Sequence, residues 1–146
     1  MKSNSIKLIA ITTLVVLSAF SYWYLSRDAY MNIFEKETEI YTNAEKLISS
    51  FVSNQDLANV TFVEKIVEVQ GIVKEVSYLN DRCTIFLEAG KHETKNSIIC
   101  DMQTNQLHSI HNLKSGDSVL IKGLFKGFLM DGIMLNCALL KKNINE

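Results

Sequence analysis

Residues 65–76, KIVEVQGIVKEV, decide the fold of this chain. Every second residue in the first part of the stretch is apolar or glycine, and these residues would share one face of an extended strand: Val67, Val69, Gly71 and Val73. After Val73 the apolar positions slip by one residue, to Val76, so the register breaks near residues 71–75, where a bulge would bend the strand. The stretch therefore predicts a long, bent β-strand that can take part in two sheets.

Four further segments repeat the period of two. Two of them flank a polar turn at residues 90–96 and two flank a turn at residues 130–132, which predicts two hairpins with these inward positions: Cys83, Ile85, Leu87 and Ala89; Ile98, Cys100 and Met102; Val119, Ile121, Gly123, Phe125 and Gly127; Ile133, Leu135, Cys137 and Leu139. Residues 105–113 between the hairpins have apolar residues three apart, enough for two short helical turns.

This order of elements, three strands, a short helix and two strands, with a glycine-bent first strand, is typical of the five-stranded OB barrel. The strands do not alternate with helices of ten or more residues, so a doubly wound parallel sheet does not fit. The predicted fold class is mainly β: an OB-fold barrel with a short helix between strands three and four.

A helix is predicted before the first strand. Thr42 and Glu45 have the S/T-x-x-E spacing of a capping box, in which the two side chains satisfy free amide groups at a helix start. An apolar stripe follows at helical spacing: Ala44, Leu47, Ile48, Phe51 and Val52. Such a stripe usually packs on the core of its own domain, so we expect a packing helix rather than a partner-binding one.

Residues 8–26 contain no charged side chain, and 19 residues in a helix are just long enough to cross a hydrocarbon core. Lys2 and Lys7 precede this run, whereas Arg27 is offset by Asp28, so the positive-inside rule places the N-terminus in the cytoplasm. The rival is a cleaved signal peptide, which the length of the run and the aromatic residues 22–24 argue against. We therefore expect a single-pass signal-anchor with the following domain on the extracytoplasmic side of the membrane.

These patterns divide the chain into a cytoplasmic tip and transmembrane anchor (1–26), a juxtamembrane stalk (27–41), an OB-fold domain with its leading helix (42–142) and a tail (143–146). Of the 15 basic residues, two precede the anchor, which leaves 13 basic against 16 acidic side chains after it. Nucleic-acid affinity comes mainly from Lys and Arg, so this balance argues against nucleic acid as the ligand.

Several segments, in their order and spacing, resemble the tRNA_anti-like OB-fold family of bacterial envelope proteins over residues 43–141. They are residues 43–47 (NAEKL) with Phe51, Asn54 and Ala58; 67–73 (VEVQGIV); Cys100; 113–123 (LKSGDSVLIKG); 127–131 (GFLMD); and 135–137 (LNC). The resemblance implies an OB fold and a bacterial envelope setting, hence the bacterial inner membrane as the location. It implies no reaction and no ligand.

OB barrels usually bind with the face of strands two and three and with the loops that join strands one to two and four to five. Those loops are residues 77–82 and 128–132 here, and the side chains expected around a ligand are Tyr78, Arg82, Phe86, Lys122, Lys126 and Phe128. A ring beside cations is what single-stranded nucleic acid or another anionic oligomer needs, and this is the alternative hypothesis. The leading hypothesis is binding of an envelope protein or a small ligand.

Catalytic, metal and cofactor sites are not predicted, and we expect the protein not to be an enzyme. His108 and His111 are three residues apart and His92 lies in a hairpin turn, but two histidines make an incomplete metal site, and no G-x-S-x-G motif is present. Cys83, Cys100 and Cys137 fall on inward strand positions. They are either buried free thiols or, for Cys100 and Cys137 on neighbouring strands, a disulfide bridge.

Overall fold

The computed structural model describes residues 2–26, 32–89 and 96–143, and the chain forms two units, Met1–Met31 and Asn32–Glu146. The first unit contains one helix, α1 (Lys2–Ser26), which is continuous. Within the described part of the chain, no helix is both long and apolar enough to cross a membrane. The transmembrane anchor expected over residues 8–26 stays a prediction from the sequence.

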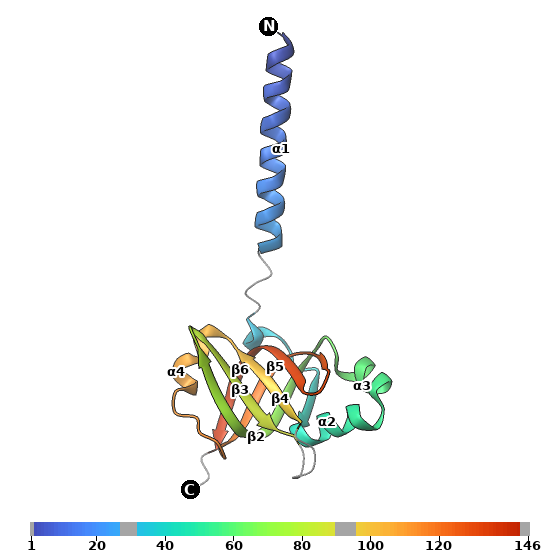
Figure 1. Ribbon diagram of the computed structural model, residues 1–146, viewed down its shortest axis with the longest axis vertical. Helices are drawn as coiled ribbons and strands as arrows, with labels where there is room; N and C mark the ends of the chain where they lie inside the picture. Colours follow the sequence, from blue (N-terminus) through green and yellow to red (C-terminus); the bar gives the residue numbers. More distant parts are fainter. Residues whose placement is uncertain (1, 27–31, 90–95, 144–146) are drawn as a thin grey trace. The chain divides into compact units, whose positions relative to one another are not determined.

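The second unit is a closed barrel of five strands (Figure 1). The strands are β2 (Lys65–Leu79), β3 (Arg82–Glu88), β4 (Ser97–Met102), β5 (Ser118–Phe128) and β6 (Gly132–Asn143). They are hydrogen-bonded in the order β2-β3-β4-β6-β5, and pairing between β5 and β2 closes the ring. Only the contact between β4 and β6 is parallel within this ring. This topology confirms the predicted OB barrel.

Strand β2 belongs to two pairings, as its sequence predicts. Its first half pairs with β5 and its second half with β3, and the register shifts between Val73 and Glu75 where the apolar pattern slips. Gly71 does not have a positive φ. A Cβ there would lie 3.2 Å from Leu87 Cδ1 and 3.3 Å from the Ala44 Cβ, so the glycine allows close packing of β2 against Leu87 on β3 and Ala44.

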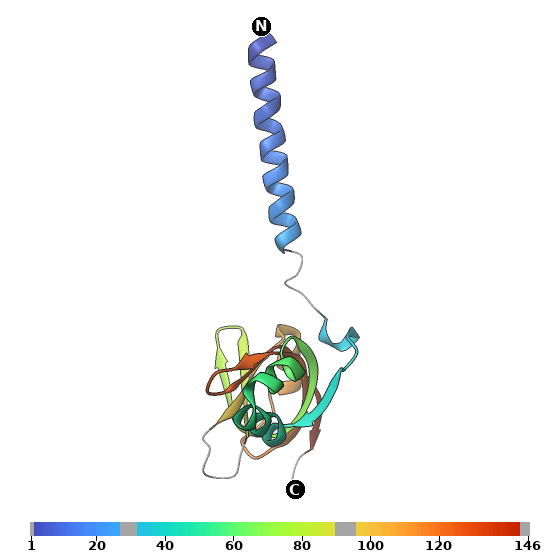
Figure 2. The same ribbon diagram turned by 90° about the vertical axis from the view of Figure 1, so that its right-hand side faces the viewer.

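Helices α2 (Ala44–Ser53) and α3 (Gln55–Phe62) lie in front of one end of the barrel in Figure 2. Helix α3 was not predicted. Four rings close this end: Phe51, Phe62, Phe125 and Phe128. Four members of the predicted apolar stripe are buried, but Val52 is exposed because it lies on the solvent side of the last turn of α2.

The N-cap of α2 is Asn43, whose side-chain oxygen accepts a hydrogen bond of 2.7 Å from the Lys46 amide. The predicted capping box with Thr42 is therefore wrong by one residue. Thr42 belongs instead to a short strand, β1 (Ile40–Asn43), which pairs in parallel with β2, and this pairing fixes the Thr42 backbone in the sheet.

Residues 32–43, called the N-terminal strap below, include a single 3-10 turn, η2 (Ile33–Glu35), and strand β1. The strap was expected to be part of a stalk, but from Asn32 onward it packs on the barrel, where η2 contacts β5 and β6 and the Ile33 side chain is completely buried. The Glu39 carboxylate lies 2.9 Å from Lys65 Nζ and accepts a hydrogen bond from the Ile66 amide.

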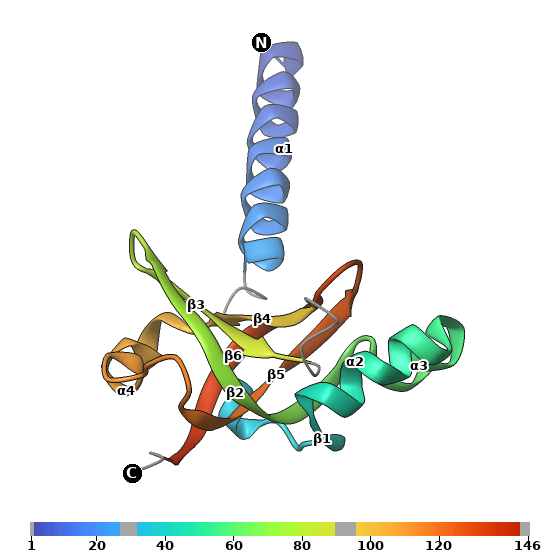
Figure 3. The same cartoon turned by 60° about the horizontal axis from the view of Figure 1, so that its bottom comes forward.

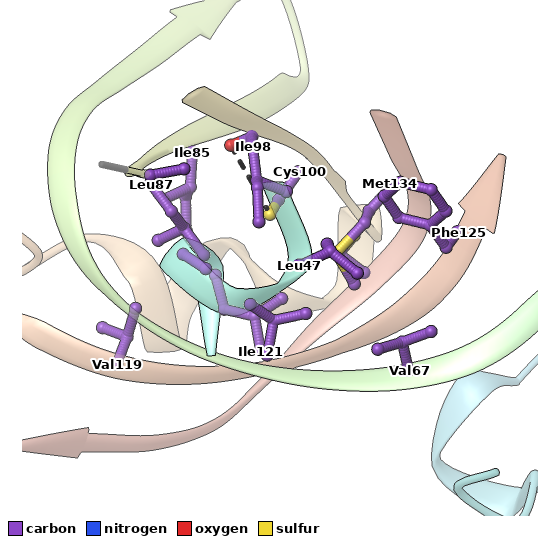
Figure 4. Close-up of a cluster of buried hydrophobic side chains, with 14 of the residues drawn as sticks. Leu47, Val67, Ile85, Leu87, Ile98, Cys100, Val119, Ile121, Phe125 and Met134 are labelled. Carbon is purple, nitrogen blue, oxygen red and sulfur yellow. Dashed lines mark hydrogen bonds between the residues drawn. The ribbon is translucent and has the colours of Figure 1, made fainter. Parts of the chain in front are cut away.

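The other end of the barrel is covered by η3 (Thr104–Gln106) and α4 (Leu107–Ile110), the two short helical turns predicted there. The barrel interior holds inward side chains from all five strands and from α2, including Leu47, Val67, Ile85, Leu87, Ile98, Cys100, Val119, Ile121, Phe125 and Met134 (Figure 4). The interior is a packed core. A ligand must therefore bind to the outside of the barrel.

Candidate ligand-binding face

One part of the outer barrel surface is closed by the strap. Along β2, β5 and the second half of β6, the outward residues Ile66, Lys122 and Ala138 are buried although they point away from the barrel interior. The Lys122 ammonium group donates a hydrogen bond to the Lys36 carbonyl, and the Thr38 hydroxyl donates one to the Glu68 carboxylate. This surface is occupied by the protein's own chain.

A row of apolar side chains lies on another part of the outer surface, across β3, β4 and the start of β6. Phe86 on β3 is opposite Ile99 on β4, and Ile99 is opposite Ile133 on β6. Their neighbours along the strands point into the core and are buried, so these three side chains point outward, and each is half-buried. We call Phe86, Ile99 and Ile133 the apolar row; β3 and β4 lie side by side in Figure 3.

The same register continues beyond both ends of the row. Glu75 on β2 is opposite Phe86, and it is exposed. Gly127 on β5 is opposite Ile133, and a Cβ at Gly127 would meet no atom within 4 Å. The apolar row is therefore flanked by the Glu75 carboxylate on the β2 side and by open space above Gly127 on the β5 side.

Polar residues border the row on both sides. On one side, Thr84 is opposite Asp101, and Asp101 Oδ2 lies 3.4 Å from Arg82 Nη2. On the other side, Glu88 is opposite Ser97, whose hydroxyl accepts a hydrogen bond of 3.1 Å from Lys74 Nζ.

The loop between β5 and β6 is tied to this second border. The Asp131 carboxylate accepts a hydrogen bond of 2.6 Å from the Ser97 amide, and the Asn96 side-chain amide donates one of 2.5 Å to the Met130 carbonyl. Leu129 and Met130 at the loop tip are exposed. The loop is thus held beside the row by backbone and side-chain contacts from the start of β4.

The charge of this face is negative. Counted over the described residues alone, it carries two positive side chains, Lys74 and Arg82, and four negative ones, a net charge of −2: Glu75, Glu88, Asp101 and Asp131. Both cations already contact groups of the face itself. Glu75 and Glu88 are exposed and have no ion pair within the described residues.

Of the six side chains predicted to surround a ligand, the structure brings only Arg82 and Phe86 to this face. Tyr78 is opposite the inward-facing Cys83, on the other side of the sheet, and its hydroxyl donates a hydrogen bond of 3.4 Å to the Ile110 carbonyl of α4. Burial and the neighbouring Cys83 thiol raise the pKa of Tyr78.

The remaining three predicted residues have structural contacts elsewhere. Lys122 lies under the strap, Lys126 forms a 2.5 Å ion pair with Glu64, and the Phe128 ring stacks on Phe51 with centroids 5.2 Å apart. The OB loop rule placed these side chains on a common surface that the structure does not form.

Sequence reasoning missed Ile99 and assigned Ile133 to the interior. Ile133 and Leu135 were predicted to point inward, but Met134 does so instead, whereas Cys137 is buried as predicted. The cause is an irregularity in β6 at Asn136, which has a φ of 53° and shifts the alternation by one residue. Ile98-Ile99-Cys100 was the available signal, because three consecutive apolar residues in a strand put one of them on the outer face.

His108, His111 and the three cysteines lie away from the face. His108 and the adjoining His111 belong to the α4 end, and His92 falls outside the described residues; within residues 2–26, 32–89 and 96–143 no group of three metal-binding side chains is found. Cys83, Cys100 and Cys137 are buried free thiols. Burial, and next the adjacent Cys100 thiol, raise the pKa of Cys137 well above its usual range.

The closed barrel defines the second unit of the chain as a small OB-fold module. The sequence matches the tRNA_anti-like family over residues 1–139, and the chain belongs to this family. No curated protein sequence matches it.

Solved structures share the fold at low identity. A candidate nucleic acid-binding lipoprotein from Klebsiella pneumoniae is 14% identical, with a TM-score of 0.56; the match covers 71% of this chain and 92% of that one. A candidate aspartyl-tRNA synthetase from Leishmania major is 9% identical with a TM-score of 0.46, and the match covers 80% of this chain and 23% of that one. The first of these likenesses supports the OB fold alone.

Proposed function

We propose that this protein is a non-catalytic binding module and that its ligand lies on the outer face of β3, β4 and the start of β6. The observation that carries the proposal is the apolar row, which no segment that the structure describes covers, whereas the strap buries the outward side chains on the other side of the barrel. OB barrels use the face of these strands for binding. The absence of enzymatic activity is part of the proposal and follows from the missing catalytic motifs in the sequence.

The proposal is tested by site-specific photo-crosslinking in cells. A photoreactive amino acid at Thr84, beside the row, is expected to form adducts, and the same amino acid at the exposed Glu37 of the strap is the control. Adducts at Thr84 that disappear with Phe86→Asp, in a protein with unchanged circular dichroism, support the face as the binding site. Equal adducts at both positions, or none at Thr84, overturn it.

Because Phe86 is half-buried, Phe86→Asp can also reduce stability, and a second variant separates the two effects. Thr84→Lys changes the border of the face without removing core contacts. The photoreactive amino acid is then placed at Asp101, and its adducts are compared with and without Thr84→Lys. Loss of these adducts in the Thr84→Lys variant reports on binding alone.

Single-stranded nucleic acid is the second candidate, and one observation favours it. Phe86 and Arg82 lie on the same side of β3, which combines a ring for stacking with a cation. The Klebsiella structure is named for nucleic-acid binding, although its 14% identity limits the likeness to the fold. Fluorescence anisotropy with an oligo(dT) strand of about ten nucleotides decides the matter. Binding at low salt that falls with added salt supports this candidate, and no binding at low salt excludes it.

We also propose that the module works on the extracytoplasmic side of the bacterial inner membrane. This rests on the sequence, in which an uncharged run at residues 8–26 follows Lys2 and Lys7. A C-terminal alkaline phosphatase fusion that is active supports the placement, and an inactive but expressed fusion overturns it. Carbonate extraction of membranes tests the attachment separately.

A further inference from the structure

We infer that the ligand is an extended segment of a partner protein whose alternate side chains are basic, apolar and apolar, running across the strands from Glu75 to Ile133. The inference rests on the proposed function of this face and adds the chemistry and direction of the ligand.

The spacing of the row fits an extended chain. Glu75, Phe86, Ile99 and Ile133 occupy one register position on four neighbouring strands. Neighbouring strands lie about 4.8 Å apart, so the distance from the first to the last is about 14 Å. A chain that rises about 3.3 Å per residue covers about 13 Å between side chains i and i+4. Three alternate side chains of one segment can thus lie over Glu75, the Phe86–Ile99 pair and Ile133.

The segment must cross the strands rather than extend the sheet. At Phe86 and Ile99, both strands are paired on both edges, β3 with β2 and β4, and β4 with β3 and β6. A ligand on this face therefore finds side chains and no free strand edge, and affinity must come from apolar contact and charge.

Charge decides the chemistry of the ligand. Glu75 is exposed at the start of the row, and Glu88 is exposed on the border. Within the described residues neither has an ion pair, while Arg82 is engaged with Asp101 and Lys74 with Ser97. A Lys or Arg above Glu75 gains a partner, whereas a phosphate backbone over these carboxylates is repelled. This is why we favour a basic protein segment over nucleic acid.

The far end of the row leaves room for the ligand chain to continue. Ile133 is followed across the strands by Gly127, which has no side chain and has open space where a Cβ would stand. The exposed Leu129 of the neighbouring loop adds apolar surface at this end. The order of the side chains across the strands is thereby set, with the basic one at the β2 end and the apolar ones toward β6, in either chain direction.

The test is selection of displayed random peptides of about ten residues on the purified full-length chain, followed by anisotropy with the enriched sequence. Enrichment of basic-x-apolar-x-apolar sequences is expected. Glu75→Lys should weaken binding of the selected peptide by about tenfold or more. The same variant should bind more strongly a second peptide in which Glu replaces the basic residue. Glu37→Lys, an equal charge change on the strap, is the matched control.

Two results overturn the inference. One is enrichment of acidic or purely apolar sequences, and the other is an equal effect of Glu75→Lys and Glu37→Lys. If Thr84 adducts persist in cells while either result is found, the face still binds and only the inferred ligand chemistry is wrong. If oligo(dT) binds and Phe86→Ala abolishes that binding, nucleic acid replaces the peptide.

Discussion

The Lys122 ammonium group on β5 donates a hydrogen bond to the Lys36 carbonyl, 86 residues earlier in the chain. Lys122 points away from the barrel interior, yet only 7% of its surface is exposed, because the strap lies over it. The two strands that flank this contact are thereby closed to ligands. Within the described residues the apolar row has no such cover, which is why we propose it as the binding face.

Replacing Lys122 by Met should loosen the strap. The change keeps the aliphatic stem but removes the donor, which leaves the Lys36 carbonyl without this partner. We expect a loss of about 1–3 kcal/mol in the free energy of unfolding by urea. Lys126→Met, which breaks only the exposed pair with Glu64, should cost less than about 1 kcal/mol. Equal losses in the two variants would show that the Lys122–Lys36 contact contributes no more to the free energy of unfolding than an exposed ion pair does.

The strap should also weaken in acid. The Lys65 side chain, and next the Ile66 amide, hold the pKa of Glu39 below its usual value. A carboxyl group with a lowered folded-state pKa stabilises the fold above the unfolded-state pKa of about 4.3, and this stabilisation is lost as the pH falls through the folded-state pKa. The Lys114 amide lowers the pKa of Asp117 in the same direction, so the two groups act together. Urea unfolding at several pH values should therefore show a shallower acid dependence for Glu39→Gln than for the wild type.

Gly123 should tolerate a side chain less well than Gly71. A Cβ at Gly123 would lie 2.6 Å from the Cys137 sulfur and 3.0 Å from Met134 Cε, which is closer than at Gly71. We expect Gly123→Ala to destabilise by about 1–3 kcal/mol and Gly71→Ala by less. Because the sulfur is the nearest atom, Cys137→Ala should partly rescue Gly123→Ala in a double-mutant cycle. Independent, additive losses would mean that the clash is relieved by backbone movement instead.

The pattern along β2 could be read correctly because its inward residues face a fully buried core and its outward ones do not. Val67, Val69 and Val73 are all completely buried, and the bulge lies where the alternation slips. The binding face could not be derived in the same way. Its composition depends on Asn136, whose positive φ shifts β6 by one residue and turns Ile133 outward. Alternation alone carries no signal for such an irregularity.

The strap was missed for a different physical reason. Ile33 stands in a segment rich in charged residues, so neither a period of two nor one of 3.6 marks it. Its burial comes from long-range packing on β5 and β6. Only the assembled barrel provides that surface, and sequence periodicity cannot show it.

The cysteines should be unreactive in the folded protein. Burial raises the pKa of Cys83, and burial together with the adjacent Cys100 raises that of Cys137, so little thiolate is present to react. We expect no labelling by an alkylating reagent in native buffer and labelling of all three thiols in denaturant. An intact mass lower by two hydrogen atoms in unreduced protein would instead show a disulfide and contradict the free thiols of the structure, and peptide mapping would tell whether it joins Cys100 and Cys137.

Two neighbouring variants test where helix α2 begins. The Asn43 side chain accepts from the Lys46 amide, whereas the Thr42 hydroxyl contacts only the Asn43 carbonyl, at 3.4 Å, from within β1. Asn43→Ala should therefore lower the free energy of unfolding by about 1 kcal/mol, the usual cost of a lost N-cap. Thr42→Val should change it little, because a β-branched residue suits the strand position that pairs with Val69. A larger loss for Thr42→Val than for Asn43→Ala would support the predicted capping box, with Thr42 as the N-cap and the helix start one residue earlier.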